Sequence, residues 1–295
     1  MTRLLVLGAA LAAGCIPPPT STQQTTVPAH ARPILVAADT ERPDWRSAFA
    51  AEGGVGTFVL LDTETGTTQR LDPDRAARRY LPASTFKVYN ALVALETGVV
   101  GDPDSVFVWD GVTREIPQWN RDHTLRSGMA ASTVWLYQRV ARAVGRDRYR
   151  AAFDRQPYGN GTVGPDVDQF WLDSSLQISA DEQIPLMDGL RQGLLAFRPD
   201  VQATVRDLLP VLVDDGRGRM LAKTGWGGFG SASGTQTPLG WLVGWVERSD
   251  GAVAVFALNV EPAAAGFDMG PARLRIARAI LASEGWLAPE PGGRP

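Results

Sequence analysis

Lysine is nearly absent from this sequence, although basic residues are common. Of the 29 basic residues in the 295-residue chain, only Lys87 and Lys223 are lysines. The formal net charge is −3 and the arginines form no run or stripe, so we do not expect nucleic acid as a partner. This bias raises the question of why lysine stands at these two positions.

Histidine and cysteine are also scarce. His30 and His123 lie far apart in the sequence, which argues against a metal site or a catalytic triad built mainly on imidazole, and we expect no metal. Cys15 is the single cysteine, so a disulfide within the chain is excluded.

The N-terminal segment 1–15, MTRLLVLGAALAAGC, has one arginine, a short apolar run and small residues at its end. This pattern is typical of a secretory signal and is too short for a stable membrane anchor. Cys15 follows Ala12, Ala13 and Gly14, which resembles the cleavage box of bacterial lipoproteins, where the cysteine is lipidated. An ordinary signal cleavage nearby is the alternative. Both interpretations predict a periplasmic protein, and the first adds a lipid anchor at Cys15.

Composition divides the rest of the chain into three parts. Residues 16–34 are rich in proline, threonine and glutamine, which predicts a disordered tether. Residues 35–288 contain no repeat and no second linker, so we expect one domain, followed by a tail at 289–295. The sequence does not indicate an oligomeric state.

Apolar patterning predicts an α+β domain. Alternating apolar residues and turn signals predict hairpins near both ends, and helical apolar spacing fills the middle. The expected strands are 56–62, 67–72, 219–225, 240–247 and 252–260, and the expected helices are 127–145, 146–156, 183–197 and 270–285. We therefore predict an antiparallel sheet built from both chain ends, flanked by helices, with a large helical insertion.

Lys87 lies three residues after Ser84, within a segment that predicts a buried helix starting near Ser84. That spacing puts both side chains on one face, together with Asn90, Ala91 and Ala94 and no acidic partner. A buried, unpaired ammonium has a lowered pKa, so this lysine can give up its proton, which arginine cannot do. A neutral amine beside a serine hydroxyl is a nucleophile–base pair. A lysine that reaches solvent beside a capping serine is the alternative.

Lys223 stands in the segment AKTGWGGFG, at the end of a predicted strand and the start of a glycine-rich turn. Glycine permits close approach of a ligand, and lysine brings a positive charge to an anionic one. A lysine that protects a sheet edge from aggregation is the alternative. The pattern S-x-x-K, followed far downstream by K-T-G, is the signature of serine penicillin-recognising enzymes.

Other segments indicate which class of serine penicillin-recognising enzymes the sequence resembles. The S-D-N element of class A β-lactamases does not occur in the sequence. The segments that do occur, in order, are IPQWNRDHTLR (116–126), MAASTVWLYQ (129–138), PYGN (157–160), QFWLDSSLQIS (169–179) and GWLVGWVE (240–247). Together with the two lysines they resemble class D, or oxacillinase-type, β-lactamases from about residue 50 to residue 280.

The resemblance implies a serine enzyme that acts on β-lactams. Ser84 would be the acylated nucleophile and Lys87 its general base, carbamylated by carbon dioxide. Trp171 matches the indole donor to the carbamate, although a core tryptophan is the alternative. Val134 would pack over the carbamate and limit water entry. No other cofactor is implied.

The same resemblance assigns the substrate contacts. Ser132 would relay a proton to the β-lactam nitrogen, although an N-cap role is its alternative. Lys223, Thr224 and Gly225 would bind the substrate carboxylate. Arg273 would assist them, although Arg275 and Arg278 share the predicted helix.

Backbone N–H groups of Ser84 and Trp226 would form the oxyanion hole. Tyr158, Gly159 and Asn160 would shape the site rather than react. Asn120, Arg121, Asp122 and His123 are expected to brace the loop before the helical insertion, with His123 not catalytic. The segment 119–129 and the glycine- and serine-rich segment 226–240 are expected to border the cleft.

Three other functions compete with a β-lactamase. A β-lactam sensor module is acylated on the same fold and stays acylated, but such receptors carry membrane spans and a protease domain. A transpeptidase carries S-x-N, and here Val134 stands where that asparagine would be. A structural lipoprotein would leave the placement of the two lysines unexplained.

Overall fold

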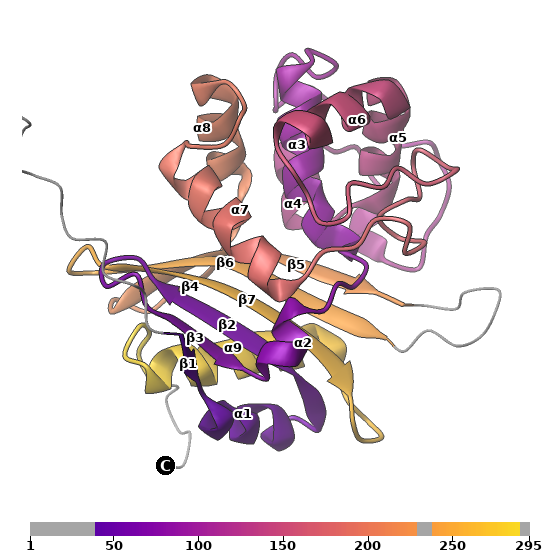
Figure 1. Ribbon diagram of the computed structural model, residues 1–295. Coiled ribbons are helices and arrows are strands. Elements are labelled where there is room, and N and C mark those ends of the chain that lie inside the picture. Colours follow the sequence, from indigo (N-terminus) through magenta and orange to yellow (C-terminus); the bar gives the residue numbers. More distant parts are fainter. Residues whose placement is uncertain (1–38, 229–237, 290–295) are drawn as a thin grey trace, which may run out of the picture. The chain divides into compact units, whose positions relative to one another are not determined.

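A seven-stranded sheet forms the centre of the fold within residues 39–228 and 238–289, which the computed structural model describes (Figure 1). Its strand order is β1-β3-β2-β7-β6-β5-β4. The strands are β1 (Thr40–Glu41), β2 (Gly54–Asp62), β3 (Thr68–Leu71), β4 (Val211–Asp214), β5 (Gly218–Gly227), β6 (Leu239–Arg248) and β7 (Val253–Pro262). The predicted signal segment, tether and Cys15 lie outside the described residues, and the predicted domain boundaries stay predictions.

The sheet joins the two ends of the domain. β2 pairs with the late strand β7 in antiparallel register, with Phe58 opposite Leu258. β7, β6, β5 and β4 continue the antiparallel pairing, and only the short β1–β3 contact is parallel within the described sheet. The predicted sheet built from both chain ends is therefore confirmed.

Helices cover both faces of the sheet. Those between β3 and β4 form the helical insertion on one face, and α1 and α9 lie on the other (Figure 1). The helices are α1 (Arg46–Ala51), α2 (Pro73–Ala77), α3 (Phe86–Glu96), α4 (Leu125–Ala130), α5 (Val134–Val144), α6 (Arg146–Arg155), α7 (Ala180–Gln192), α8 (Pro199–Leu208) and α9 (Met269–Ser283), with short 3₁₀ turns η1 (Pro43–Trp45), η2 (Ala83–Thr85) and η3 (Pro117–Trp119).

Two hydrophobic cores follow from the alternation of side chains along the strands. In β2, Phe58 and Leu60 enter the core beneath α9, whereas Val59 between them enters the core beneath the helical insertion. β6 alternates in the same way, with Leu242 on one face and Val243 on the other. The central strands are apolar on both faces because both faces are covered.

Two predicted helices differ from the observed ones. The helix expected over 127–145 is interrupted at 131–133, where Ser132 has a φ of 55° that a continuous helix does not allow. The helix expected over 183–197 begins earlier, at a capping box between Ser179 and Glu182, and ends at Gly193 in left-handed conformation. α8 then begins with Pro199 in its first turn and was not predicted.

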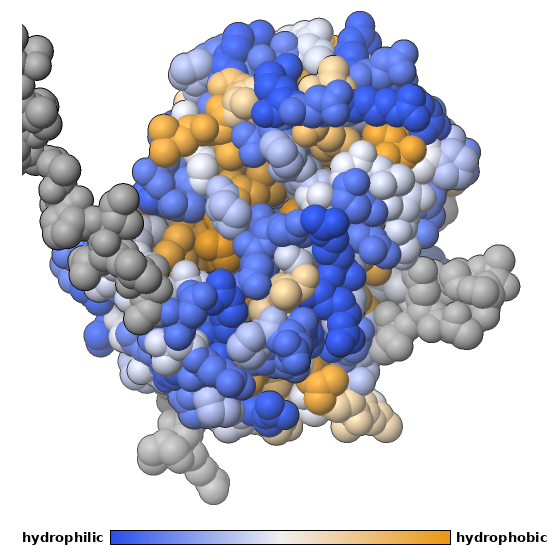
Figure 2. All heavy atoms as spheres, viewed as in Figure 1, coloured by the Kyte–Doolittle hydropathy of each residue, from blue (hydrophilic) through white to orange (hydrophobic). Residues whose placement is uncertain are grey.

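The surface on the face drawn in Figure 2 is mostly hydrophilic, with hydrophobic residues in separate groups. None of the helices in the described part of the chain has the length and apolar content needed to span a bilayer.

Candidate active site

Ser84 lies in η2, directly before α3. Ala83, the residue before it, has a φ of 48°, a left-handed conformation that non-glycine residues rarely adopt and that clusters at functional sites. Two hydrogen bonds hold this turn: the Ala83 N–H donates to the Trp171 carbonyl at 3.1 Å, and the Thr85 hydroxyl donates to the Pro82 carbonyl at 2.7 Å. The backbone around Ser84 is therefore fixed from both sides.

Lys87 lies one turn further along α3 and reaches back to the serine. Its Nζ is 2.7 Å from Ser84 Oγ, and its side chain is only 1% exposed. It lies 5.4 Å from the centre of the Tyr137 ring. Burial lowers the pKa of Lys87 to about 7, because the ammonium form loses its hydration. The buried helix and the serine–lysine pair predicted from the sequence are both present.

Lys223 projects from β5 toward Ser132, from the far side of the cleft. Its Nζ donates to Ser132 Oγ at 2.9 Å and to the Thr224 carbonyl at 2.8 Å. Burial lowers the pKa of Lys223 well below its ordinary value, and the nearby charges of Lys87 and Arg273 lower it further. Within residues 39–228 and 238–289 none of these three cations forms a salt bridge, so the site favours an anionic ligand.

Gly225 lets β5 approach the nucleophile turn. A Cβ atom at this position would lie 3.1 Å from the Pro82 carbonyl oxygen, 3.1 Å from Thr85 Cγ2 and 3.0 Å from Trp241 Cβ. The absence of a side chain therefore permits β5 to pack directly on η2. Arg273 of α9 donates to the Gly225 carbonyl at 2.6 Å, and burial lowers the pKa of its guanidinium to about 10.

The C-terminal arginines occupy different places. Arg273 lines the cleft, whereas Arg275 pairs with Glu52 at 2.9 Å away from it. The position of Arg273 therefore agrees with the residue chosen from the sequence.

Ser132 owes its position to the interruption between α4 and α5. Thr133, not Ser132, is the N-cap residue of α5, so the N-cap interpretation of Ser132 is wrong. The Thr133 N–H donates to the Gly128 carbonyl at 2.9 Å, which fixes the turn onto α4. Val134, the first residue of α5, lines the cleft beside Ser132.

Trp171 is fully buried beside the nucleophile turn. Its ring stacks on Phe86 with centroids 5.4 Å apart, and its indole N–H has no hydrogen-bond partner among the described residues. A buried donor without a partner is costly unless another group satisfies it. Trp171 is thus part of the core and also holds an unused donor.

A cleft of about 350 Å³ joins these elements. Its lining includes most of the predicted residues together with apolar residues from the helical insertion: Ser84, Ile116, Trp119, Ala130, Ala131, Ser132, Val134, Leu172, Thr224, Gly225, Trp226 and Arg273. Lys87 and Lys223 are buried next to it. The sequence predicted the polar lining and Trp119. Ile116 and Leu172 lie within the motif segments 116–126 and 169–179, but an apolar residue there is equally typical of a core position and gave no separate signal.

Tyr158, Gly159 and Asn160 do not line the cleft. Tyr158 packs its ring edge against Phe86 with centroids 5.4 Å apart. Burial raises the pKa of Tyr158 above its ordinary value, which disfavours it as a base. Gly159 has a φ of 51°, and Asn160 bonds the backbone of Ser175 at 2.8 Å. They shape the core behind the site. Part of the predicted border segment, residues 229–237, lies outside the described residues.

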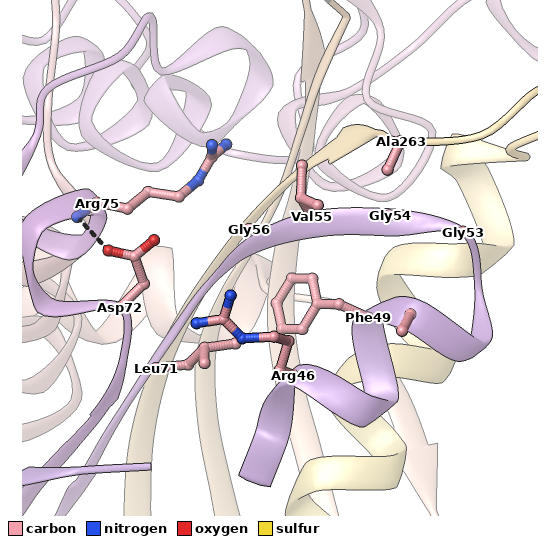
Figure 3. A pocket seen from close by; sticks show the side chains of 11 residues that line it. Arg46, Phe49, Gly53, Gly54, Val55, Gly56, Leu71, Asp72, Arg75 and Ala263 are labelled. Atoms are coloured by element: carbon pink, nitrogen blue, oxygen red, sulfur yellow. Dashed lines mark hydrogen bonds between the residues drawn. The ribbon is translucent and has the colours of Figure 1, made fainter. Parts of the chain in front are cut away.

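Another cavity, of about 390 Å³, lies between α1 and the start of β2 (Figure 3). Arg46 and Phe49 of α1 line it, and at its edge the Asp72 carboxylate accepts the Arg75 backbone N–H at 3.0 Å. It contains no serine or lysine. It is larger than the cleft at Ser84 but lacks a nucleophile, so chemistry rather than size identifies the active site.

Comparisons with known proteins agree with this geometry. The family model described as penicillin binding protein transpeptidase domain matches residues 56–282. β-Lactamase OXA-2 of Salmonella typhimurium is 41% identical over 254 residues, which cover 85% of this chain and 88% of that protein. β-Lactamase OXA-10 of Pseudomonas aeruginosa is 36% identical over 253 residues, which cover 85% of this chain and 92% of that protein.

Solved structures show the same relationship. The class D β-lactamase FUS-1 (OXA-85) of Fusobacterium nucleatum subsp. polymorphum aligns with a TM-score of 0.75 at 33% identity, covering 83% of this chain and 98% of that one. The class D β-lactamase YbXI of Nostoc aligns with a TM-score of 0.76 at 32% identity, covering 82% and 99%. With a Ser84–Lys87 pair facing Lys223 across one cleft, this chain belongs to the class D β-lactamases, within the transpeptidase-domain family of penicillin-binding proteins.

Proposed function

We propose that this chain hydrolyses the β-lactam ring of penicillin-type antibiotics through an acyl-enzyme on Ser84. The observation that carries this proposal is the 2.7 Å contact between Lys87 Nζ and Ser84 Oγ, with the pKa of Lys87 lowered to about 7 by burial. A general base acts best when its pKa lies near the working pH. The curated relatives at 36–41% identity are named β-lactamases.

Acylation follows from the arrangement of the two lysines. Ser84 Oγ attacks the lactam carbonyl carbon while its proton passes to the base at Lys87, and the C–N bond then breaks. The leaving nitrogen takes a proton from the Ser132 hydroxyl, which lies 2.9 Å from Lys223 Nζ. The proton taken up at Lys87 then returns to the Ser132 oxygen, so that both groups are restored before deacylation. We assign the oxyanion to the backbone N–H groups of Ser84 and Trp226, both of which line the cleft.

Deacylation uses the same base. A water gives a proton to the base at Lys87 and attacks the ester carbonyl, and Ser84 Oγ departs with a proton. We assign the substrate carboxylate to Lys223, Thr224 and Gly225, assisted by Arg273, because these residues line or adjoin the cleft and pair with no acidic side chain in the described part of the chain.

We further propose that Lys87 is carbamylated by carbon dioxide. Only a neutral amine adds carbon dioxide, and a pKa near 7 leaves much of Lys87 neutral at physiological pH. The buried indole N–H of Trp171, which has no hydrogen-bond partner among residues 39–228 and 238–289, is a donor suited to a carbamate oxygen. The carbamate would supply an anionic oxygen as proton acceptor, and Val134 would restrict water above it.

The test is hydrolysis of a chromogenic cephalosporin with and without bicarbonate. We expect turnover that rises with bicarbonate, and a loss of about a hundredfold to ten-thousandfold in Lys87→Ala, the range typical of a general base. Trp171→Phe should need more bicarbonate for the same rate, whereas Trp45→Phe, a buried tryptophan outside the cleft, should not. A single stoichiometric burst without turnover would instead identify a β-lactam sensor or penicillin-binding module.

We also propose export to the periplasm, with a lipid anchor at Cys15. The support is the sequence of residues 1–15 alone. Labelling cells with a radioactive fatty acid tests the anchor: the label should enter the wild-type protein and not Cys15→Ala. A mature protein without label would show ordinary signal cleavage.

A further inference from the structure

His123 is buried at the junction of three segments around the cleft and has no place in the proposed reaction. Its side chain is 1% exposed. Its Nε2 lies 2.9 Å from the Gln118 carbonyl oxygen and 3.2 Å from Thr133 Oγ1, and its Nδ1 lies 3.0 Å from Ser127 Oγ. One imidazole therefore contacts the η3 loop, α4 and the N-cap of α5.

These contacts determine the tautomer and the protonation state of the His123 imidazole. The Gln118 carbonyl can only accept a hydrogen bond, so Nε2 carries the proton and donates. In the neutral imidazole Nδ1 then accepts, and the Ser127 hydroxyl is its donor. Burial lowers the pKa of His123, which agrees with a neutral ring.

The Thr133 hydroxyl contacts His123 rather than capping its own helix. A threonine at an N-cap ordinarily bonds a backbone N–H in the first turn of its own helix. Thr133 forms no such side-chain cap, and its hydroxyl faces His123 instead. The turn that contains Ser132, a residue in left-handed conformation, is thus held by His123, which lies outside α5.

Two tryptophan contacts join the same segments. The Trp119 indole N–H donates to the Ala131 carbonyl at 2.9 Å, and the Trp135 indole N–H donates to the Trp119 carbonyl at 2.8 Å. One wall of the cleft, with Trp119, is therefore fixed to the wall that carries Ser132, and His123 lies at the junction between them.

We propose that His123 is a positioning residue for Ser132: its neutral imidazole ties the η3 loop and α4 to Thr133 and thereby holds the Ser132 hydroxyl at Lys223. The proposal rests on the proposed function, in which Ser132 delivers the proton to the leaving nitrogen. A hydroxyl displaced by about 1 Å can cost up to a hundredfold in rate, so acylation should depend on His123.

The test uses two variants. His123→Leu keeps a side chain of similar bulk but removes both hydrogen-bonding positions, and we expect a roughly tenfold to hundredfold slower acylation with a nearly unchanged KM. His123→Gln retains a donor amide and an acceptor oxygen, and should recover most of the rate.

Gln202→Leu provides the control for stability. Gln202 is equally buried, and its side chain bonds the backbone of Leu195 and Phe197 next to α8, outside the cleft. The Gln202→Leu variant should lower the melting temperature about as much as His123→Leu does, without changing the acylation rate. A wild-type acylation rate in folded His123→Leu would overturn the proposal, as would equal losses in the Leu and Gln variants.

Measuring acylation alone tests the role of His123 independently of whether the protein completes hydrolysis. The acylation rate constant is measured with a fluorescent penicillin in a single turnover, before any product release. If the wild-type protein acylates once and does not turn over, the proposed hydrolysis fails, yet the effect of His123 on acylation is still measured.

Discussion

Lys87 and Lys223 are both buried, but their different surroundings suit them to different chemical roles. Lys87 contacts Ser84 Oγ and the Tyr137 ring, and burial alone shifts its pKa to about 7. Lys223 donates to Ser132 and to the Thr224 carbonyl, contacts that suit a donor. Arginine cannot replace Lys87, because a guanidinium does not release its proton in a protein.

The pH dependence of acylation should therefore follow Lys87. Below a pH of about 7 the amine is protonated and cannot act as a base, and above it the neutral form predominates. We expect the acylation rate constant to rise with pH through about 7 and then level, measured by single-turnover fluorescence in bicarbonate-free buffer. A pH-independent rate across the neutral range in the wild-type protein would contradict this assignment, and Lys87→Ala provides the baseline.

At the scale of elements, the site depends on the close packing of β5 against η2. Gly225 is the contact point, because a Cβ there would lie within 3.1 Å of the Pro82 carbonyl oxygen, Thr85 Cγ2 and Trp241 Cβ. A neighbour that cannot move aside makes an added methyl group destabilising, by about 1–3 kcal/mol in overpacked cores.

Gly225→Ala should therefore lower the free energy of unfolding by about 1–3 kcal/mol and slow acylation, because β5 and η2 separate. Urea unfolding and single-turnover kinetics measure the two effects. Gly101→Ala is the matched control, since a Cβ at Gly101 meets nothing within 4 Å, and its unfolding free energy should change by less than about 0.5 kcal/mol. Equal effects in the two variants would refute the packing argument.

At the scale of the whole molecule, a partly buried ion pair joins the beginning and the end of the described chain. Arg42 donates to both carboxylate oxygens of Glu284 at 2.6 and 2.7 Å, and the Trp45 indole donates to Glu284 at 3.1 Å. Burial alone would raise the pKa of Glu284, but the hydrogen bonds from Arg42 and Trp45 outweigh it, and the pKa is lowered.

Glu284→Gln should cost about 1.5–3 kcal/mol of unfolding free energy at neutral pH, the range for hydrogen bonds to charged groups. A carboxylate with a lowered pKa stabilises above its unfolded pKa and loses that contribution as pH falls through the folded one. The difference between wild type and variant should therefore vanish in acid, as measured by urea unfolding at both pH values.

The control is Asp250→Asn at the exposed pair with Arg248, which should cost less than about 1 kcal/mol. If the Glu284 and Asp250 variants lose the same unfolding free energy, or if the loss in the Glu284 variant persists in acid, the ion pair between Arg42 and Glu284 is not the cause.

The sequence pattern alone predicts those features that depend on residues close to one another along the chain. The apolar runs of β2, β6 and β7 predicted strands, and the spacing of Ser84 and Lys87 predicted their contact, because a helix places residues three apart on one face. The break at Ser132 was missed, because helical apolar spacing continues across residues 131–133 while the turn is set by contacts with Gly128 and His123. Contacts that join one element to another leave no periodic signal in the sequence.

The pairing of β2 with β7 has a consequence for how the chain is made. Phe58 and Leu258 are opposite each other in the finished sheet, but a ribosome synthesises them about 200 residues apart. Until β7 emerges, β2 has only the short strand β3 beside it, and its other edge stays open to wrong partners. The native sheet cannot be completed before the last strand is present, so the growing chain lacks its full set of strand pairs until synthesis is nearly over.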